Sequence, residues 1–278
     1  MLKYIRDELV SMTDKGNYQT FTSSLIPGCN NIIGVRQPAL KKYAKQLVKE
    51  NEDFRKLLTE PDLYYEETLL RGYIIGMGTA KEKDFDKALE DLKKFVPLID
   101  NWAVNDGFCV EFRIMDKYRQ EFLPFLEKCI LSEDEFEARA GLIMLLDHYI
   151  KVDADGNKKP RMKKVMLEDI GMCGENNKKE EQGMYIDKIL LLVNRDFSSN
   201  GYYTQMAAGW LLAECFVTFP LDTWRYLTDK ENMKLDNVSY KKAIRKICES
   251  LTPDDEVKEV VRAVSYTHLR AHETGRNL

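Results

Sequence analysis

The spacing of its apolar residues constrains this chain more than any other feature. Through most of the 278 residues they recur every three or four positions, whereas the alternation typical of β-strands is almost absent. Phe85, Ala88, Leu89, Leu92 and Val96, for example, fall on one side of a helix. The pattern therefore predicts an all-α fold.

The same spacing divides the chain into successive amphipathic segments. Helices are expected after Pro38 and over 65–77, 85–96, 101–112, 119–131, 134–150, 185–193, 201–217, 221–227, 238–251 and 254–264. Short breaks at 79–81, 132–133 and 219–220 suit antiparallel helix hairpins. About six helical pairs of roughly 40 residues each are typical of HEAT-type arrays. We therefore expect one HEAT-like helical-repeat solenoid, an α-α superhelix, over residues 1–264.

Two segments depart from this periodicity. Residues 151–183 have little of it outside 165–170 and predict a long connection, whose run Lys158–Lys164 either contacts DNA or is a solvated basic surface. The Asp-Ala-Asp-Gly-Asn sequence there lacks the sixth-position Gly and twelfth-position Glu of a calcium loop, so no calcium site is expected. Residues 265–278 resemble a translated sequencing adaptor, and we treat them as a non-native tail.

Composition limits the chemistry and the partners of the chain. Lys and Arg number 42 against 46 Asp and Glu, so the net charge of -4 requires any nucleic-acid site to be a local basic surface. Six scattered cysteines without a CxxC pair or an export signal predict reduced thiols in a cytoplasmic protein. Outside the tail, His148 is the one histidine, which disfavours a Ser/His/Asp triad or a metal centre. No cofactor, metal or membrane span is expected.

Three segments carry residues suited to chemistry. Trp102 and Asp106 are four residues apart and therefore share one face of a helix, while Tyr203 and Trp210 are two turns apart on another. Arg139 lies in an otherwise apolar helix and needs a partner, either an acid or a phosphate. From spacing alone, the simpler interpretation makes both indoles core anchors and Asp106 a solvated or capping acid.

Taken in order along the chain, these segments resemble the DNA alkylation repair family, whose members fold as HEAT-like repeats around a concave DNA-binding surface. The resemblance spans most of residues 1–264, and its markers are Leu25-Ile26-Pro27-Gly28, the segment 33–42, the block 101–106, Arg139 and the segment 202–210. In glycosylases of the family the matching residues form the catalytic cleft. The resemblance thus implies catalytic roles for Trp102, Asp106, Arg139 and Trp210.

The resemblance implies a monomeric DNA glycosylase that hydrolyses the N-glycosidic bond of cationic N3- or N7-alkylated purines in double-stranded DNA. Asp106 would stabilise the developing sugar cation and orient water, and the two indoles would clasp the lesion-bearing nucleotide. Arg139 would hold a backbone phosphate. It further implies that the lesion is processed without full extrusion into a pocket.

Further basic and aromatic residues are expected to contact DNA: Arg36, Lys41, Lys42, Lys45, Tyr203, Lys241, Lys242, Arg245 and Lys246. Ala138 and Met206 stand near positions where characterised members usually carry additional Lys or Arg. Two alternatives therefore stay open. One is a catalytically weak or inactive protein that binds duplex or branched DNA, and the other is a protein-interaction scaffold.

Overall fold

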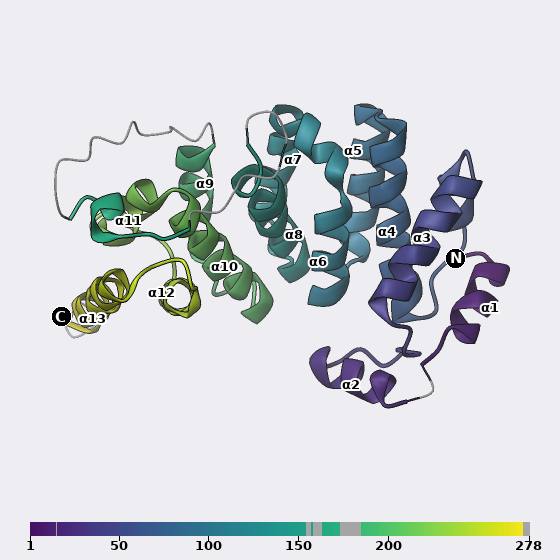
Figure 1. The fold of residues 1–278 in the computed structure, drawn as a ribbon, viewed down its shortest axis with the longest axis horizontal. Coiled ribbons are helices and arrows are strands. Elements are labelled where there is room, and N and C mark those ends of the chain that lie inside the picture. The colour runs from purple at the N-terminus through teal and green to yellow at the C-terminus, as the bar shows by residue number, and fades with distance from the viewer. Residues whose placement is uncertain (15, 154–156, 158–162, 173–184, 275–278) are drawn as a thin grey trace. The chain divides into compact units, whose positions relative to one another are not determined.

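The computed structural model describes residues 1–14, 16–153, 157, 163–172 and 185–274, with side chains up to Val264. In this part of the chain the regular elements are helices (Figure 1), and one isolated bridge pairs Val165 with Pro253. Helices pack mainly on their next and next-but-one neighbours along the chain, as in a helical repeat. The predicted all-α fold is confirmed.

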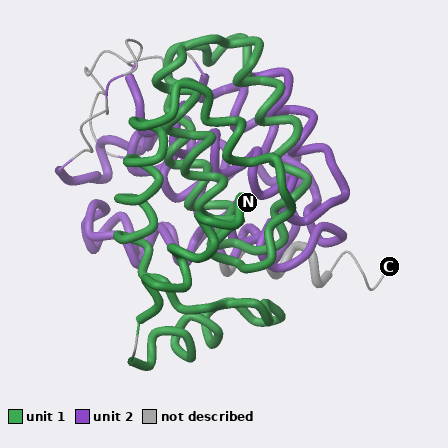
Figure 2. Tube along the Cα trace, turned by 90° about the vertical axis from the view of Figure 1, so that its right-hand side faces the viewer, with its two compact units in different colours: residues 1–122 green, residues 123–278 purple. Residues whose placement is uncertain are grey.

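The chain divides into two compact units, residues 1–122 and 123–278 (Figure 2). The first contains α1 (Lys3–Ser11), α2 (Tyr18–Leu25), α3 (Gln37–Glu50), η1 (Phe54–Leu58), α4 (Tyr65–Glu82), α5 (Phe85–Phe95), η2 (Val96–Leu98), α6 (Trp102–Glu111) and η3 (Arg113–Lys117). The boundary falls within α7 (Arg119–Ile130). The second contains α8 (Glu135–Leu145), η4 (Leu146–Ile150), η5 (Leu167–Ile170), α9 (Ile186–Val193), α10 (Tyr202–Thr218), α11 (Pro220–Thr228), α12 (Asn237–Glu249) and α13 (Asp255–Thr274).

Helix α4 is the centre of the first unit and packs against α3, α5 and α6. Glycine residues allow α4 and α6 to pack closely. A Cβ added to Gly76 would lie 2.8 Å from the carbonyl carbon and oxygen of Glu111, and one added to Gly72 would lie 3.1 Å from Cβ of Phe108. On α6, Gly107 faces Tyr73 of α4 in the same way. Because backbone meets backbone here, α4 fixes the position of α6.

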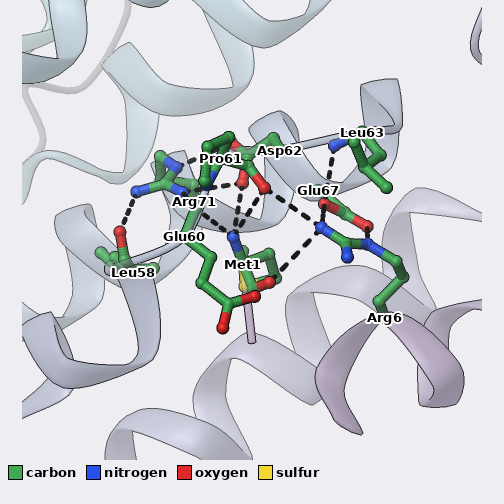
Figure 3. Close-up of polar contacts among 9 residues, drawn as sticks. All are labelled: Met1, Arg6, Leu58, Glu60, Pro61, Asp62, Leu63, Glu67 and Arg71. Carbon is green, nitrogen blue, oxygen red and sulfur yellow. Dashed lines mark hydrogen bonds and ion pairs between the residues drawn. The ribbon is translucent and has the colours of Figure 1, made fainter. Parts of the chain in front are cut away.

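A buried charge network joins α1 to the segment that precedes α4 (Figure 3). Arg71 of α4 donates to both carboxylate oxygens of Asp62, at 2.7 and 2.8 Å, and to two backbone carbonyls of that segment. Arg6 of α1 pairs with the fully buried carboxylate of Glu67, and the Met1 nitrogen donates to Asp62 at 3.3 Å. The carboxylates of Glu67 and Asp62 therefore each have a cationic partner in this network.

Helix α10 is the centre of the second unit and packs against α8 and α12. Ala207, Ala208, Leu211 and Leu212 are fully buried along it. At Gly209 an added Cβ would lie 2.7 Å from Cβ of Lys242, so α12 passes close to α10 at this level. These neighbours, α8, α10 and α12, lie side by side in Figure 1.

Helix α4 is longer than predicted, and the expected break at 79–81 is wrong. The helix runs to Glu82 and ends at Lys83, which adopts the left-handed conformation with φ 62°. Thr79 does not interrupt it, because the residue is fully buried and its hydroxyl donates to the Ile75 carbonyl at 2.8 Å. Helices α1 and α2 were not among the predicted segments.

At the other end of the chain, α13 continues past Val264 to Thr274, although the predicted helix ended at 264. No Gly or Pro occurs between Asp255 and Thr274, so no residue there breaks a helix. Of the expected connection 151–183, residues 154–156, 158–162 and 173–183 lie outside the described residues, including most of the basic run. Its described part forms η5, which packs on α11.

Candidate active site

Trp102 and Asp106 lie on the first turns of α6. The helix begins here because the side chain of Asn101 accepts hydrogen bonds from the backbone N–H groups of Ala103 and Val104, at 3.1 and 3.0 Å. Trp102 is its first residue, and Asp106 follows one turn later. Both side chains are partly exposed, so the predicted pair is accessible from solvent.

The orientation of Trp102 is fixed by a contact with α2. Its indole Nε1 donates to the backbone carbonyl of Leu25 at 3.0 Å. Leu25 ends α2 and begins the marker Leu25-Ile26-Pro27-Gly28. Leu25 and Phe21 are 46% and 57% exposed, so α2 presents apolar side chains to solvent. The segment Leu25-Ile26-Pro27-Gly28 thus contributes to the site by accepting a hydrogen bond from Trp102.

A buried carboxylate shapes the segment that begins the second marker. Glu66 of α4 is fully buried and accepts backbone hydrogen bonds from Ile33, Gly34 and Val35, at 3.0, 2.7 and 3.2 Å. Gly34 has φ 88°, a conformation that favours glycine. The three donors satisfy the charge of Glu66 and fix the backbone just before Arg36.

Arg36 projects from this segment toward solvent. Its Nε donates to Asp14 at 2.7 Å, its guanidinium lies 4.8 Å from the centroid of the Tyr18 ring, and its side chain is 61% exposed. The hydrogen bond from Arg36, followed by that from the Gly16 backbone, holds the pKa of Asp14 below its ordinary value. Arg36 is therefore oriented by its partners and reachable by a phosphate.

The cations of α3 divide into two kinds. Lys41 pairs with Glu111 of α6 at 2.9 Å, and its ammonium lies 5.1 Å from the centroid of the Tyr73 ring. Lys42 and Lys45 are exposed. Lys41 thus links α3 to the helix that carries Asp106, whereas Lys42 and Lys45 face solvent.

In the second unit, Arg139 lies between α8 and α10. Its side chain is buried, with the residue 5% exposed, and Nη1 donates to the backbone carbonyl of Tyr203 at 2.6 Å. The Tyr203 N–H in turn donates to Glu135 at 2.6 Å, and its ring centroid lies 5.7 Å from that of Phe136. The two helices are therefore tied together at their first turns. The sequence predicted an acid or a phosphate as the partner of Arg139, and the structure shows a backbone carbonyl in contact with it.

Trp210 lies two turns farther along α10, about 10 Å from Tyr203 at the helical rise. Its indole Nε1 donates to Glu214 at 3.3 Å, and the ammonium of Lys151 lies 5.1 Å from its ring centroid. Arg139 thus meets α10 two turns before Trp210 along the helix. Lys151 and Glu214 are site residues that sequence reasoning missed.

A cavity of about 340 Å³ opens beside Trp210. It lies between α10, α12 and the segment 250–252, and its lining includes Trp210, Glu214, Val217, Lys246, Glu249 and Thr252. Ligand sites in proteins typically enclose roughly 300–1,000 Å³. The cavity is therefore large enough for a small organic group.

Helix α12 presents the second group of predicted DNA contacts. The Lys242 ammonium lies 4.1 Å from the Tyr202 ring centroid and 3.0 Å from the Met206 sulfur. Burial, and then repulsion from Arg245 and Lys246, lowers the pKa of Lys242. Arg245 is exposed and pairs with Glu249 at 2.7 Å, and Lys241 is exposed as well. Crowded positive charges of this kind favour an anionic partner.

The residues that the structure describes offer neither a metal site nor a membrane-spanning helix. Among them, no three His, Cys, Asp or Glu side chains are grouped so that they could hold a metal ion. No helix in that part of the chain is both long and apolar enough to cross a bilayer.

Comparison with known proteins gives one family. The family described as DNA alkylation repair enzyme matches residues 5–247, which is 243 of the 278 residues and includes every predicted site residue. No curated protein matches the chain.

Proposed function

Because the chain belongs to the DNA alkylation repair enzyme family, we propose that it is a DNA glycosylase acting on purines made cationic by alkylation at N3 or N7. The observation that supports this most directly is the pair on α6. Asp106 is a partly exposed carboxylate one turn from Trp102, and the indole is held by the Leu25 carbonyl. DNA repair follows from the family, whereas the glycosylase reaction is our proposal.

The proposed reaction needs little more than these groups. An alkylated purine already carries positive charge, so the bond from C1′ to the base nitrogen breaks with its electron pair going to the base, which leaves neutral. Asp106 stabilises the oxocarbenium-like sugar electrostatically and orients the water whose oxygen adds to C1′. The proton that this water loses passes to the carboxylate or to solvent.

DNA binding is assigned to the exposed cations of each unit. In the first unit these are Arg36, Lys42 and Lys45, and in the second Lys241 and Arg245, to which the half-buried Lys242 is added. The net charge of -4 makes such local groups necessary. For Arg139, burial and the bond to the Tyr203 carbonyl favour support of α10 over a direct phosphate contact.

The test uses duplex DNA containing 7-methylguanine or 3-methyladenine, with free base measured in single turnovers. Wild type should release the base, and Asp106→Asn should lose release while still binding the duplex. Asp86→Asn, which neutralises an exposed acid on α5, is the matched control and should keep full release. Unchanged release by Asp106→Asn refutes the role of this carboxylate.

The same assay separates the alternatives. Tight, salt-sensitive binding without release by wild type would indicate a DNA-binding protein that is not an enzyme, and absence of DNA binding at low salt would indicate a protein-interaction scaffold. We further propose a cytoplasmic monomer. The five described cysteines are free thiols, in keeping with a reducing compartment.

A further inference from the structure

Two arginines among the proposed DNA contacts are already paired with carboxylates in the free protein. Nε of Arg36 donates to Oδ2 of Asp14 at 2.7 Å, and Nε of Arg245 donates to Oε1 of Glu249 at 2.7 Å. The two arginine side chains are 61% and 80% exposed. In each unit a carboxylate oxygen therefore occupies a place at the guanidinium that a phosphate oxygen would otherwise take.

The exposed lysines beside these arginines differ from them. Lys42 and Lys45 lie on α3, which Arg36 precedes, and Lys241 lies on α12 with Arg245. None of the three lysines pairs with a carboxylate among the residues that the structure describes. Each group of cations thus combines free lysines with an arginine whose charge is neutralised.

Asp14 is held in place by the backbone around it. Its N–H donates to the Gly34 carbonyl at 3.0 Å, and its Oδ1 accepts the N–H of Gly16 at 2.8 Å. These bonds leave Oδ2 for Arg36, and the Asp14 side chain is only 23% exposed. Because the carboxylate is fixed beforehand, its pairing with Arg36 costs little side-chain entropy.

Glu249 stands where a carboxylate does not favour the helix. It is the last residue of α12, and the negative end of the helix dipole disfavours an acid there. Arg245 comes four residues before it, which is the less favourable order for an ion pair of this spacing. Its second oxygen lies 3.9 Å from the ammonium of Lys246, another predicted DNA contact. The two cations that it neutralises, and not helix stability, account for an acid at this position.

We infer that Asp14 and Glu249 are intramolecular competitors of DNA phosphate, which weaken binding to duplex DNA by neutralising Arg36 and Arg245. The inference rests on the proposed function for DNA as the partner. A phosphate that reaches either guanidinium must displace the carboxylate or lie about 6 Å from it, where repulsion between the two charges in water lowers the affinity about threefold.

The competition also changes the response to salt. DNA releases counterions when cations of the protein neutralise its phosphates, and an arginine that is already neutralised adds little to this release. The free lysines therefore govern the encounter with DNA, and the arginines contribute where the carboxylate is displaced. Undamaged duplex, which is present in large excess over damaged sites, thus holds the protein less tightly.

The test measures binding to a short, labelled, unmodified duplex by fluorescence anisotropy at several salt concentrations. Asp14→Asn and Glu249→Gln are compared with wild type. The matched controls are Glu90→Gln in the first unit and Glu127→Gln in the second, which neutralise acids paired with lysines outside the predicted DNA contacts. All four variants change the net charge by the same single unit, so the comparison isolates the local effect.

Asp14→Asn and Glu249→Gln should each bind about threefold more tightly than their controls, and each should steepen the slope of log K against log salt by up to about 0.9. Unchanged affinity overturns the inference, and so does an equal gain by the controls, which reflects net charge alone. Weaker binding overturns it too, because the carboxylate then positions the arginine for a phosphate. Glu249→Gln decides the matter by itself if Asp14→Asn disturbs the turn at Gly16.

A comparison of two cations on α12 tests the same inference without changing an acid. Lys241→Met should reduce the salt slope by about 0.9, and Arg245→Met by less than half as much. Equal reductions would mean that Glu249 does not neutralise Arg245.

These measurements require no base release, so the two proposals fail separately. Base release by wild type together with unchanged affinities of the acid variants refutes this inference alone. Affinity gains without base release refute the glycosylase reaction alone. If neither wild type nor any variant binds duplex at low salt, DNA binding and this inference are both refuted.

Discussion

The close contact between α4 and α6 sets two effects of a Gly76→Ala substitution on the free energy of unfolding against each other: helix propensity and overpacking. Substitution of an exposed helical glycine by alanine stabilises a helix by about 1 kcal/mol, because alanine has less backbone freedom to lose. Gly76 is buried against α6, however. Its added Cβ would meet the carbonyl carbon and oxygen of Glu111 at 2.8 Å and Cβ of Glu111 at 3.0 Å.

Backbone atoms cannot rotate out of the way as a side chain can, so α6 must shift. Overpacking of this kind costs about 1–3 kcal/mol, and the upper part of that range applies where the neighbour is backbone. After the gain in helix propensity is subtracted, we expect Gly76→Ala to lower the free energy of unfolding by about 2 kcal/mol.

Gly72, one turn earlier in the same helix, is the matched control. Its added Cβ would meet Cβ of Phe108 and the ring of Phe95 at 3.1 Å, a milder overlap with side-chain atoms. The packing cost and the propensity gain then nearly cancel, and Gly72→Ala should leave the free energy of unfolding within about 0.5 kcal/mol of wild type.

Urea unfolding of the three proteins, with comparison of midpoints at equal slope, measures these differences. Since Glu111 and Asp106 share α6, folded Gly76→Ala should also release alkylated base more slowly than Gly72→Ala. If Gly76→Ala proves as stable as wild type or more stable, the close α4–α6 contact does not control the position of α6 and the reasoning fails.

Four further outcomes follow from single groups. Trp102→Phe removes the hydrogen bond to the α2 carbonyl and should cost about 1 kcal/mol of stability in urea unfolding. Lys241→Ala should weaken binding to every duplex sequence and reduce the slope of log K against log salt by about 0.9 in a salt titration. The hydrogen bond from Arg55 holds the pKa of Glu82 below its ordinary value. The ionised Glu82 carboxylate therefore stabilises the fold at neutral pH, and this contribution is lost as pH falls through the folded-state pKa. Glu82→Gln should make the free energy of unfolding depend less on pH in the acid range. Burial raises the pKa of Cys129 to about 12, so at neutral pH an alkylating reagent should label this thiol only after unfolding, as mass spectrometry can show.

A one-sided apolar stripe is one pattern by which the sequence predicted helices. In α5 and at its C-terminal end, Ala88, Leu92 and Val96 of the predicted stripe are buried, whereas Phe85 and Leu89 are half-buried. Helix α2 lacked such a stripe, because Thr22 is its one buried residue and its sequence is rich in Ser and Thr, which are weak helix formers. Its place in the fold depends instead on contacts with distant residues, such as that between Leu25 and Trp102, 77 residues apart.

Some residues of the candidate site were likewise predictable from local spacing, and others were not. Trp102 and Asp106 share a face because they are four residues apart on one helix, and local spacing was sufficient to predict this. The partners of Trp210 were not predictable by that route. Lys151 reaches the ring only through the π-helical turn before it and through the packing of α8 on α10, and neither is encoded in a residue spacing.

On the proposed function, the two indoles differ in the charge that each is suited to meet. Trp102 donates its N–H to a neutral carbonyl and stands one turn from Asp106, which is suited to the positive charge that develops on the sugar. Trp210 donates to a carboxylate, and an anionic acceptor polarises the indole so that its π face becomes more negative. That face holds the Lys151 ammonium in the free protein. Trp210 is therefore suited to a fixed positive charge, whereas Trp102 and Asp106 are suited to a charge that develops only as a bond breaks.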